Sequence, residues 1–264
     1  MPTFQLVCDE NLSSPEAEGA PIVYKVAENR HEREAAFRLV YNAYTRSGLI
    51  EENPHAMRVT PYQLLDTTDV FIAMLDDELI STVSLVCDGN LGLPMEEIYG
   101  AEVAELRARG LCVAEVSCLA DRRRQLSRTL PVFIPLMRLL AQAARYRGIE
   151  QLLVAVHPRH AGFYRRCLSF DLMGDEKTYP VVRNNPAVAL SLDFPKLDKL
   201  RPVNFDRFFY DTFFGTQLPT TQLARHPMSD DERRFFGPAA EFGGAFTLVS
   251  PGDEQRVRGG AAVA

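Results

Sequence analysis

Apolar and polar positions follow two kinds of pattern along this chain, one typical of strands and the other of helices. Short apolar or alternating runs predict strands at residues 22–27, 70–75, 79–86, 111–121, 151–156, 171–179 and 187–192. Apolar residues recur at helical spacing in the segments 29–48, 60–67, 93–109, 129–148 and 161–168. The order over residues 21–195 is β-α-α-β-β-α-β-α-β-α-β-β, which predicts one α/β domain built on a mixed sheet.

The two ends of the chain differ in composition from this central part. Residues 1–20 are polar and acidic, so we expect a mobile N-terminal tail. Beyond Pro195, aromatic residues are interleaved with charged ones, and residues 196–249 are predicted to form a helical, aromatic-rich C-terminal extension packed on the core. Residues 250–264 are rich in glycine and alanine and are predicted to be a disordered tail.

Composition is that of an ordinary globular protein, with 46% apolar and 24% charged residues among 264. The net charge of -6 gives no general reason to expect nucleic-acid binding. No apolar run approaches the ~20 residues that a transmembrane helix needs. The polar N-terminal segment lacks the features of a secretory signal. Five cysteines without a C-x-x-C pair favour reduced thiols, so a cytoplasmic location is expected.

The strand predicted at 111–121 carries an acid in an otherwise apolar run. Both faces of such a strand are expected to be covered, and alternation places Glu115 and Ser117 on the same face as Val113 and Leu119. A carboxylate in that position is costly unless it is paired or used. Two interpretations remain open at this point. Glu115 is either a structural acid held by an arginine or by backbone donors, or a group that performs chemistry.

The strands at 111–121 and 151–156 are joined by one helix of crossover length, which predicts a parallel pair. Ligands in such sheets bind at the carboxyl ends of strands. Five side chains are therefore expected to face one crevice: Glu115, Ser117, Arg122, His160 and Tyr164. This set suits acyl transfer, in which an acid takes a proton from an amine, backbone donors bind the oxyanion and a phenol protonates a leaving thiolate.

Several short motifs, each occurring once, follow one another between residues 22 and 194. They are Leu93-Pro-Met95, Tyr99 with Leu106-Arg107, Ala114-Glu-Val-Ser117 with Leu119-Ala120, His157-Pro-Arg-His160, Phe163-Tyr164 with Leu168 and Phe170, and Asn184-Asn185-Pro186-Ala187. With these motifs the chain resembles the GNAT acyltransferase superfamily. Within it, the chain is similar to the long-chain N-acyl amino acid synthases of the N-acyltyrosine synthase group. The acyl-homoserine-lactone synthases share the fold and a comparable strand glutamate.

The resemblance implies a GNAT fold, here with the helical C-terminal extension, and an enzyme that acylates an amino acid. It also implies a fatty acyl donor on acyl carrier protein, as an acyl-phosphopantetheine thioester co-substrate with no further cofactor. Ordinary acetyltransferases hold the coenzyme A pyrophosphate with a Q/R-x-x-G-x-G/A turn. The corresponding residues 122–128 contain no glycine and four arginines, Arg122, Arg123, Arg124 and Arg128. These suit an acidic carrier protein or its phosphodiester; the alternative is a solvated loop.

Roles within the expected crevice follow from this chemistry. Glu115 is the expected base, acting through water. The backbone N–H groups of Ser117 and Cys118 are expected to bind the oxyanion or the pantetheine arm, with Leu119 beside the acyl donor. Tyr164 resembles the phenol that GNAT enzymes use as general acid, although a tyrosine on a short amphipathic helix also serves packing.

The acceptor and metal predictions rest on fewer residues. His160 is expected to orient the substrate or to cap its helix. His157 and His160 have no third ligand at useful spacing, so no metal site is predicted. Tyr44 and Arg46, at the end of the first long helix, are candidates for contact with the carboxylate of the acceptor or with the acyl donor; the alternative is an ordinary exposed helix end.

Two other functions stay open on the sequence. One is an acyl-homoserine-lactone synthase, which would depend on S-adenosylmethionine. The other is a non-catalytic module that binds acyl chains or acyl carrier protein, with Glu115 neutralised by an arginine. The C-terminal extension is expected either to cover the acyl pocket beside the helix segment 132–140 or to form a contact in a homo-oligomer.

Overall fold

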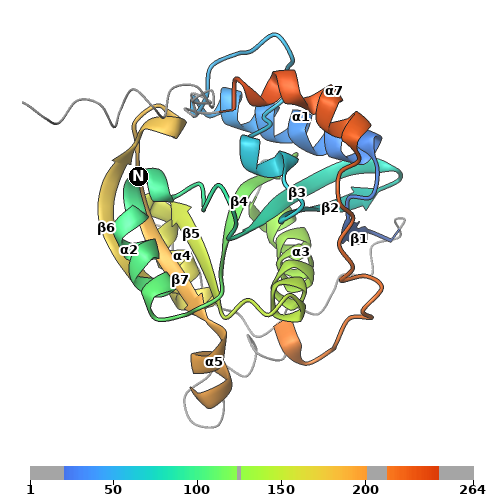
Figure 1. The fold of residues 1–264 in the computed structure, drawn as a ribbon. Helices are drawn as coiled ribbons and strands as arrows, with labels where there is room; N and C mark the ends of the chain where they lie inside the picture. The colour runs from blue at the N-terminus through green and yellow to red at the C-terminus, as the bar shows by residue number, and fades with distance from the viewer. Residues whose placement is uncertain (1–20, 124–125, 201–212, 244–264) are drawn as a thin grey trace, which may run out of the picture.

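The computed structural model describes residues 21–123, 126–200 and 213–243 (Figure 1). These residues form one sheet with the strand order β1-β2-β3-β4-β5-β7-β6. The strands are β1 (Val23–Val26), β2 (Thr68–Leu75), β3 (Glu78–Cys87), β4 (Val113–Asp121), β5 (Gln151–Val156), β6 (Asp171–Tyr179) and β7 (Asn185–Asp193). Neighbouring strands are antiparallel except β4 and β5, which are parallel. The predicted mixed α/β sheet is therefore confirmed.

Helices cover both faces of the sheet (Figure 1). One face carries α1 (Arg30–Arg46) and α2 (Glu96–Ala108), and the other carries α3 (Leu126–Tyr146) and α4 (Pro158–Cys167). The shorter elements are η1 (Pro61–Leu64), η2 (Pro180–Val182), α5 (Phe194–Leu200) and α7 (Asp230–Ala240). No helix in the described part of the chain is both long and apolar enough to cross a membrane.

Two of the helices are placed differently from the prediction, for local reasons. The segment 60–67 forms only the 3-10 helix η1, because Leu65 already has an extended conformation. The helix expected at 161–168 begins earlier, at Pro158. There the His157 side chain accepts a hydrogen bond from the Arg159 N–H (3.2 Å), and a proline suits the first helical turn. His157, and not His160, therefore caps α4.

β4 and β5 separate soon after they begin to pair. Their pairing extends only from Val113–Gln151 to Glu115–Leu153, and beyond this point the two strands have no common hydrogen-bonded register. Both strands keep a partner on their outer side, β3 for β4 and β7 for β5. The sheet therefore opens between two firmly paired arms, and Glu115 lies at the last residue pair before the opening.

A bulge in β4 changes which side chains share a face. Between two aligned residue pairs, β3 advances by two residues and β4 by three, and Cys118 takes the left-handed conformation with φ 52°. The expectation that Leu119 shares a face with Glu115 is therefore wrong. Leu119 packs against the core cluster of α3, whereas Cys118 packs against Val40 of α1.

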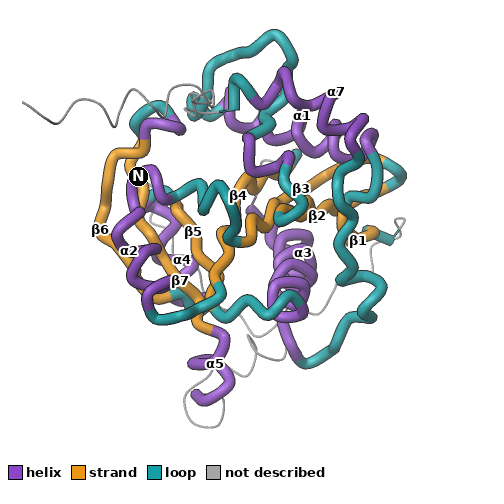
Figure 2. The backbone as a smooth tube through the Cα atoms, in the orientation of Figure 1, coloured by secondary structure: helices purple, strands orange, loops and turns teal. Residues whose placement is uncertain are grey.

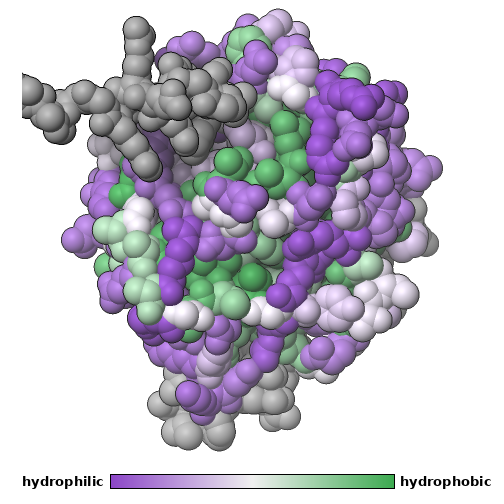
Figure 3. Space-filling view, in the orientation of Figure 1, coloured by the Kyte–Doolittle hydropathy of each residue, from purple (hydrophilic) through white to green (hydrophobic). Residues whose placement is uncertain are grey.

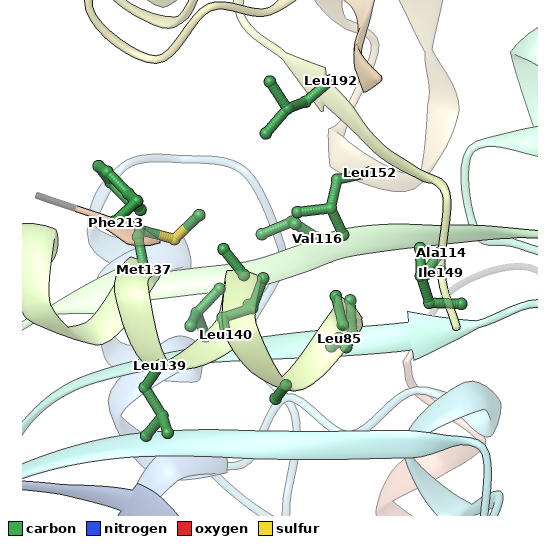
Figure 4. Packing of buried hydrophobic residues seen from close by; sticks show 14 of the residues in the cluster. Leu85, Ala114, Val116, Met137, Leu139, Leu140, Ile149, Leu152, Leu192 and Phe213 are labelled. Carbon is green, nitrogen blue, oxygen red and sulfur yellow. The ribbon is translucent and has the colours of Figure 1, made fainter. Parts of the chain in front are cut away.

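The main core lies between the sheet and α3 (Figure 4). Met137 and Leu140 on the sheet-facing side of α3 pack with Leu85 of β3 and Val116 of β4. All of these side chains are less than one tenth exposed. This packing holds β4 against α3 up to the point where the sheet opens.

The segment after β7 returns to the core. Phe213 and Phe214 are buried in the cluster of α3. Helix α7 lies along α1 (Figure 1), with the Phe236 ring in edge contact with Phe37 at a centroid distance of 5.0 Å. The segments 1–20 and 250–264, expected to be tails, lie outside the described residues.

Candidate active site

A cavity of about 1200 Å³ fills the opening between β4 and β5. Residues 116–119 of β4 and 154–156 of β5 line its two sides, and α4, η2 and the segment before η1 close it. Apolar residues gather in the middle of the face shown in Figure 3, between polar residues on either side. Four of the five side chains expected in one crevice line this cavity: Glu115, Ser117, His160 and Tyr164.

Glu115 is buried at the cavity, with 3% of its surface exposed. Its carboxylate Oε2 accepts a hydrogen bond from the Met95 backbone N–H at 2.7 Å. No basic side chain of the described residues forms an ion pair with it. Burial raises the pKa of Glu115 to about 8; the Met95 hydrogen bond opposes this shift and the charge of Glu96 adds to it. The acid is therefore positioned by one backbone donor and is not neutralised by an arginine.

The segment that supplies the Met95 N–H is held in place by Arg107 of α2. The Arg107 guanidinium binds Asp88 at 2.7 Å and Glu96 at 2.5 Å. Gly92 has φ 68°, and a side chain there would collide with the Glu96 carboxylate. The motif residues before and within α2 thus position a hydrogen-bond donor for Glu115, a role that the sequence did not indicate.

Ser117 and Cys118 lie in the bulge of β4 and line the cavity. The Ser117 hydroxyl donates to the Cys118 sulfur at 3.6 Å. Burial raises the pKa of the Cys118 thiol, so the thiolate needed for a nucleophile is disfavoured. The left-handed backbone at Cys118 is strained. It turns the peptide groups of the bulge out of the regular hydrogen-bond pattern between β3 and β4.

Helix α4 brings Tyr164 and His160 to the other side of the cavity. Burial raises the pKa of Tyr164 to about 12, so the phenol keeps its proton at neutral pH. Burial and the neighbouring Arg159 and His157 lower the pKa of His160. The His160 Nε2 accepts a hydrogen bond from Arg159 Nε at 3.0 Å. No group of three His, Cys, Asp or Glu side chains in the described residues could hold a metal ion.

Helix α1 brings one of its two candidate residues, Tyr44 and Arg46, to the cavity. Tyr44 lines the cavity, and burial raises its pKa. Arg46 is exposed and does not line the cavity. Three other arginines line it: Arg58, which is buried, and Arg159 and Arg166 of α4, which are exposed. The only sequence signal for Arg58 is its place between two apolar residues, Met57 and Val59, and this is too weak to identify a ligand-binding residue.

The structure does not bring Arg122 to the cavity. Its guanidinium pairs with Glu78 at the surface, and both side chains are more than half exposed. Arg123 binds Asp121 at 2.6 Å. Arg124 and the Arg128 side chain lie outside the described residues. The expectation that Arg122 faces the crevice is wrong, because this residue follows the end of β4 and is held by Glu78 and the Ile80 carbonyl at the start of β3.

The part of the cavity beside α3 and α4 is apolar. The residues that line it there are Val116, Leu119, Phe133, Val154, Val156 and Phe163. The rings of Phe133 and Phe163 lie 6.0 Å apart. The cavity therefore has polar, titratable groups where β4 and β5 begin to diverge and an apolar region on the α3 side.

The chain was compared with known proteins at the level of families. The model of the FeeM N-acyl amino acid synthase family matches residues 35–193. The chain belongs to this family. A similar solved structure is that of FeeM, an N-acyl amino acid synthase from uncultured soil microbes, with 28% sequence identity and a TM-score of 0.58. The alignment covers 68% of this chain and 93% of FeeM. The search of curated proteins found no match.

Other solved structures share the fold. The acyl-homoserine-lactone synthase LasI is 15% identical with a TM-score of 0.52, covering 76% of this chain and 98% of LasI. MesI, a CoA-dependent acyl-homoserine lactone synthase, is 17% identical with a TM-score of 0.51, covering 75% of this chain and 97% of MesI. The architecture agrees with the GNAT acyltransferase fold that the resemblance implied, and membership of the FeeM family makes the protein an acyltransferase.

Proposed function

We propose that this acyltransferase moves a long-chain fatty acyl group from acyl carrier protein to the α-amine of an amino acid. The observation that carries the proposal is Glu115, a buried carboxylate that has no cationic partner in the part of the chain that the structure describes. It lies at the polar end of a cavity that continues into an apolar region. Membership of the FeeM family supports the amino acid acceptor. The shared fold of LasI and MesI supports acyl transfer in general and does not favour a lactone product.

The reaction needs a neutral amine and an ionised Glu115. The amine nitrogen attacks the thioester carbonyl carbon, the C–N bond forms, and the carbonyl oxygen becomes an oxyanion that the Ser117–Cys118 backbone is placed to bind. The nitrogen passes its proton to Glu115 through a water molecule. A pKa of about 8 lies near the working pH, as an efficient general base requires.

Collapse of the oxyanion breaks the C–S bond and releases the pantetheine thiolate. Tyr164 lines the same cavity and supplies the proton that converts the thiolate to a thiol. The resulting phenolate is a stronger base than the Glu115 carboxylate, because the pKa values are about 12 and about 8. A proton then returns from Glu115 to Tyr164 through solvent, and both groups regain their starting state.

The apolar region beside Phe133 and Phe163 supports a long acyl chain, since burying each CH₂ group contributes about 0.8 kcal/mol. The carrier-protein donor is supported by the lack of glycine and the four arginines in residues 122–128. A donor of this kind would meet the enzyme in the cytoplasm, which is part of the proposal.

The direct test is incubation of the protein with acyl carrier protein thioesters of several chain lengths and the twenty amino acids, with mass spectrometry of the products. We expect an N-acyl amino acid. If no pairing gives one, the proposal is wrong. A lactone formed only with S-adenosylmethionine would assign the protein to the lactone synthases. Tight acyl binding without turnover would make it a binding module.

The donor is tested separately by charge reversal. Arg122→Glu with Arg123→Glu is expected to raise the KM for the acyl carrier protein thioester about ten-fold or more, and to leave the KM for an acyl-coenzyme A of the same chain nearly unchanged. Arg109→Glu is the matched control, because Arg109 is exposed and lies outside the cavity lining. Equal effects on both donors would remove the carrier-protein assignment.

A further inference from the structure

Arg58 is a buried arginine whose side chain has no hydrogen-bond or ion-pair partner among the described residues. It lies in the loop between α1 and η1 (Figure 2), and only 5% of its surface is exposed. Its Nε is fully buried and has no hydrogen-bond partner. Within the described part of the chain, no carboxylate lies within ion-pair distance of its guanidinium. A buried cation in this condition is destabilising unless a ligand supplies the missing charge.

The loop position of Arg58 is well defined. Its backbone N–H donates to the Phe37 carbonyl of α1 at 3.0 Å, and the flanking Met57 and Val59 are buried in the cluster between α1 and α7. The side chain is thus directed by a packed backbone to the cavity that it lines together with Glu115. The positive charge of Arg58 opposes the upward pKa shifts of three groups, Tyr44, Tyr179 and the Cys118 thiol.

None of these three neighbours can neutralise Arg58. Burial raises the pKa of Tyr44, of Tyr179 and of the Cys118 thiol, so all three are uncharged at neutral pH. The Tyr179 hydroxyl already donates to the Pro94 carbonyl at 2.9 Å. The cavity therefore presents a buried guanidinium and a buried carboxylate that do not pair with each other. The other charged residues of its lining, Glu96, Glu97, Arg159 and Arg166, are more exposed. A zwitterion with one negative and one positive end complements this arrangement.

We propose that Arg58 binds the α-carboxylate of the acceptor, so that the site selects amines with an adjacent carboxylate. This inference rests on the proposed function and defines its acceptor class. A guanidinium offers a planar fork of N–H donors that matches a carboxylate. With the carboxylate on Arg58, the amine of the acceptor lies in the cavity that Glu115 also lines. Arg58 is thus a specificity-determining residue that neither the motifs nor the family match identifies.

The test compares each amino acid with its carboxamide, which keeps the amine and the side chain but lacks the negative charge. The amine of the amide is less basic, so a larger fraction is unprotonated at neutral pH, and in the absence of carboxylate recognition the amide would react faster. We expect the wild-type protein to prefer the acid. In Arg58→Met the KM for the acid should rise roughly 10- to 100-fold, with little change in kcat and no change for the amide.

Two further variants complete the experiment. Arg58→Lys keeps the charge and loses the fork, so an intermediate KM is expected. Arg109→Met changes an exposed arginine outside the cavity and is expected to match the wild type. If Arg58→Met keeps the preference for the acid, or loses activity on the acid and on the amide to the same extent, Arg58 does not bind the carboxylate.

A binding measurement separates this inference from the proposed function. Millimolar amino acid should raise the melting temperature of the wild-type protein and of Arg58→Lys, and should not raise that of Arg58→Met. An inactive wild-type protein that still shows this pattern would contradict the acyltransfer to amino acids and support the carboxylate site. An active wild-type protein whose Arg58→Met variant is stabilised equally by the amino acid would contradict the carboxylate site alone.

Discussion

Two regions of this protein each contain one buried arginine and one buried glutamate. In one region the two side chains form an ion pair, and in the other they do not. At the contact between α1 and α7, Arg33 binds Glu232 at 2.5 Å. At the cavity between β4 and β5, Arg58 and Glu115 form no ion pair with each other or with any other described residue. All four residues are at least nine-tenths buried. Because unpaired burial is costly, the second arrangement is expected only where a ligand completes it.

The pKa values of the two buried glutamates shift in opposite directions. Burial favours the protonated form of both. In Glu232 the hydrogen bonds from Ser229 and the charge of Arg33 outweigh burial, and the pKa is lowered. In Glu115 a single hydrogen bond from Met95 does not outweigh burial, and the pKa rises to about 8. An acid that stabilises the fold is thus distinguished from an acid available for proton transfer by its partners, not by its depth.

The first prediction concerns the effect of removing each buried carboxylate on the rate of catalysis. Glu115→Gln keeps the size and an oxygen acceptor for the Met95 N–H but removes the base, so kcat should fall by about 10²–10⁴-fold. Glu232→Gln should leave kcat per folded molecule unchanged, because Glu232 lies at the α1–α7 contact. Steady-state rates for both variants with one acyl donor and one amino acid give the answer. An unchanged rate in Glu115→Gln would return Glu115 to a structural role.

The second prediction applies one substitution to both buried arginines. Arg33→Met leaves Glu232 buried without its cation and removes the bonds of Arg33 to the Ala27 and His226 carbonyls. The free energy of unfolding should fall by about 3–5 kcal/mol. Arg58→Met removes a charge that has no partner within residues 21–123, 126–200 and 213–243, so stability should stay equal or increase. Urea unfolding of the two variants and the wild type measures the difference. Equal losses would show that Arg58 has a partner within the fold.

The third prediction concerns the pH dependence of stability. The folded protein binds the Glu115 proton more tightly than the unfolded chain, so stability should fall as pH rises from about 4.5 to about 8. Glu115→Gln removes this loss, so its stability relative to the wild type should increase as pH rises through this range. Glu232, with its lowered pKa, has the opposite sign: its contribution is lost as pH falls below about 4.5. Urea titrations at several pH values test both directions, and a difference between Glu115→Gln and the wild type that is constant with pH would contradict the raised pKa.

The sequence determined the sheet, the order of its elements and several of the site residues, because these depend on local patterns. An apolar run interrupted by one acid identified β4 and Glu115, and a single helix between two such runs identified the parallel pair. His160 and Tyr164 followed from their position just after β5. These predictions needed only side-chain periodicity and the rule that ligands bind at the carboxyl ends of parallel strands.

Only the tertiary structure decided how the charges of the site are paired. The bulge at Cys118 depends on the register between β3 and β4 and moved Leu119 to the α3 side. Arg122 and Arg58 are both arginines near apolar segments. Arg122 binds Glu78 at the surface, whereas Arg58 is buried at the cavity and has no partner among the residues that the structure describes. The partner of a charge is set by contacts between segments distant in sequence, which local patterns do not encode.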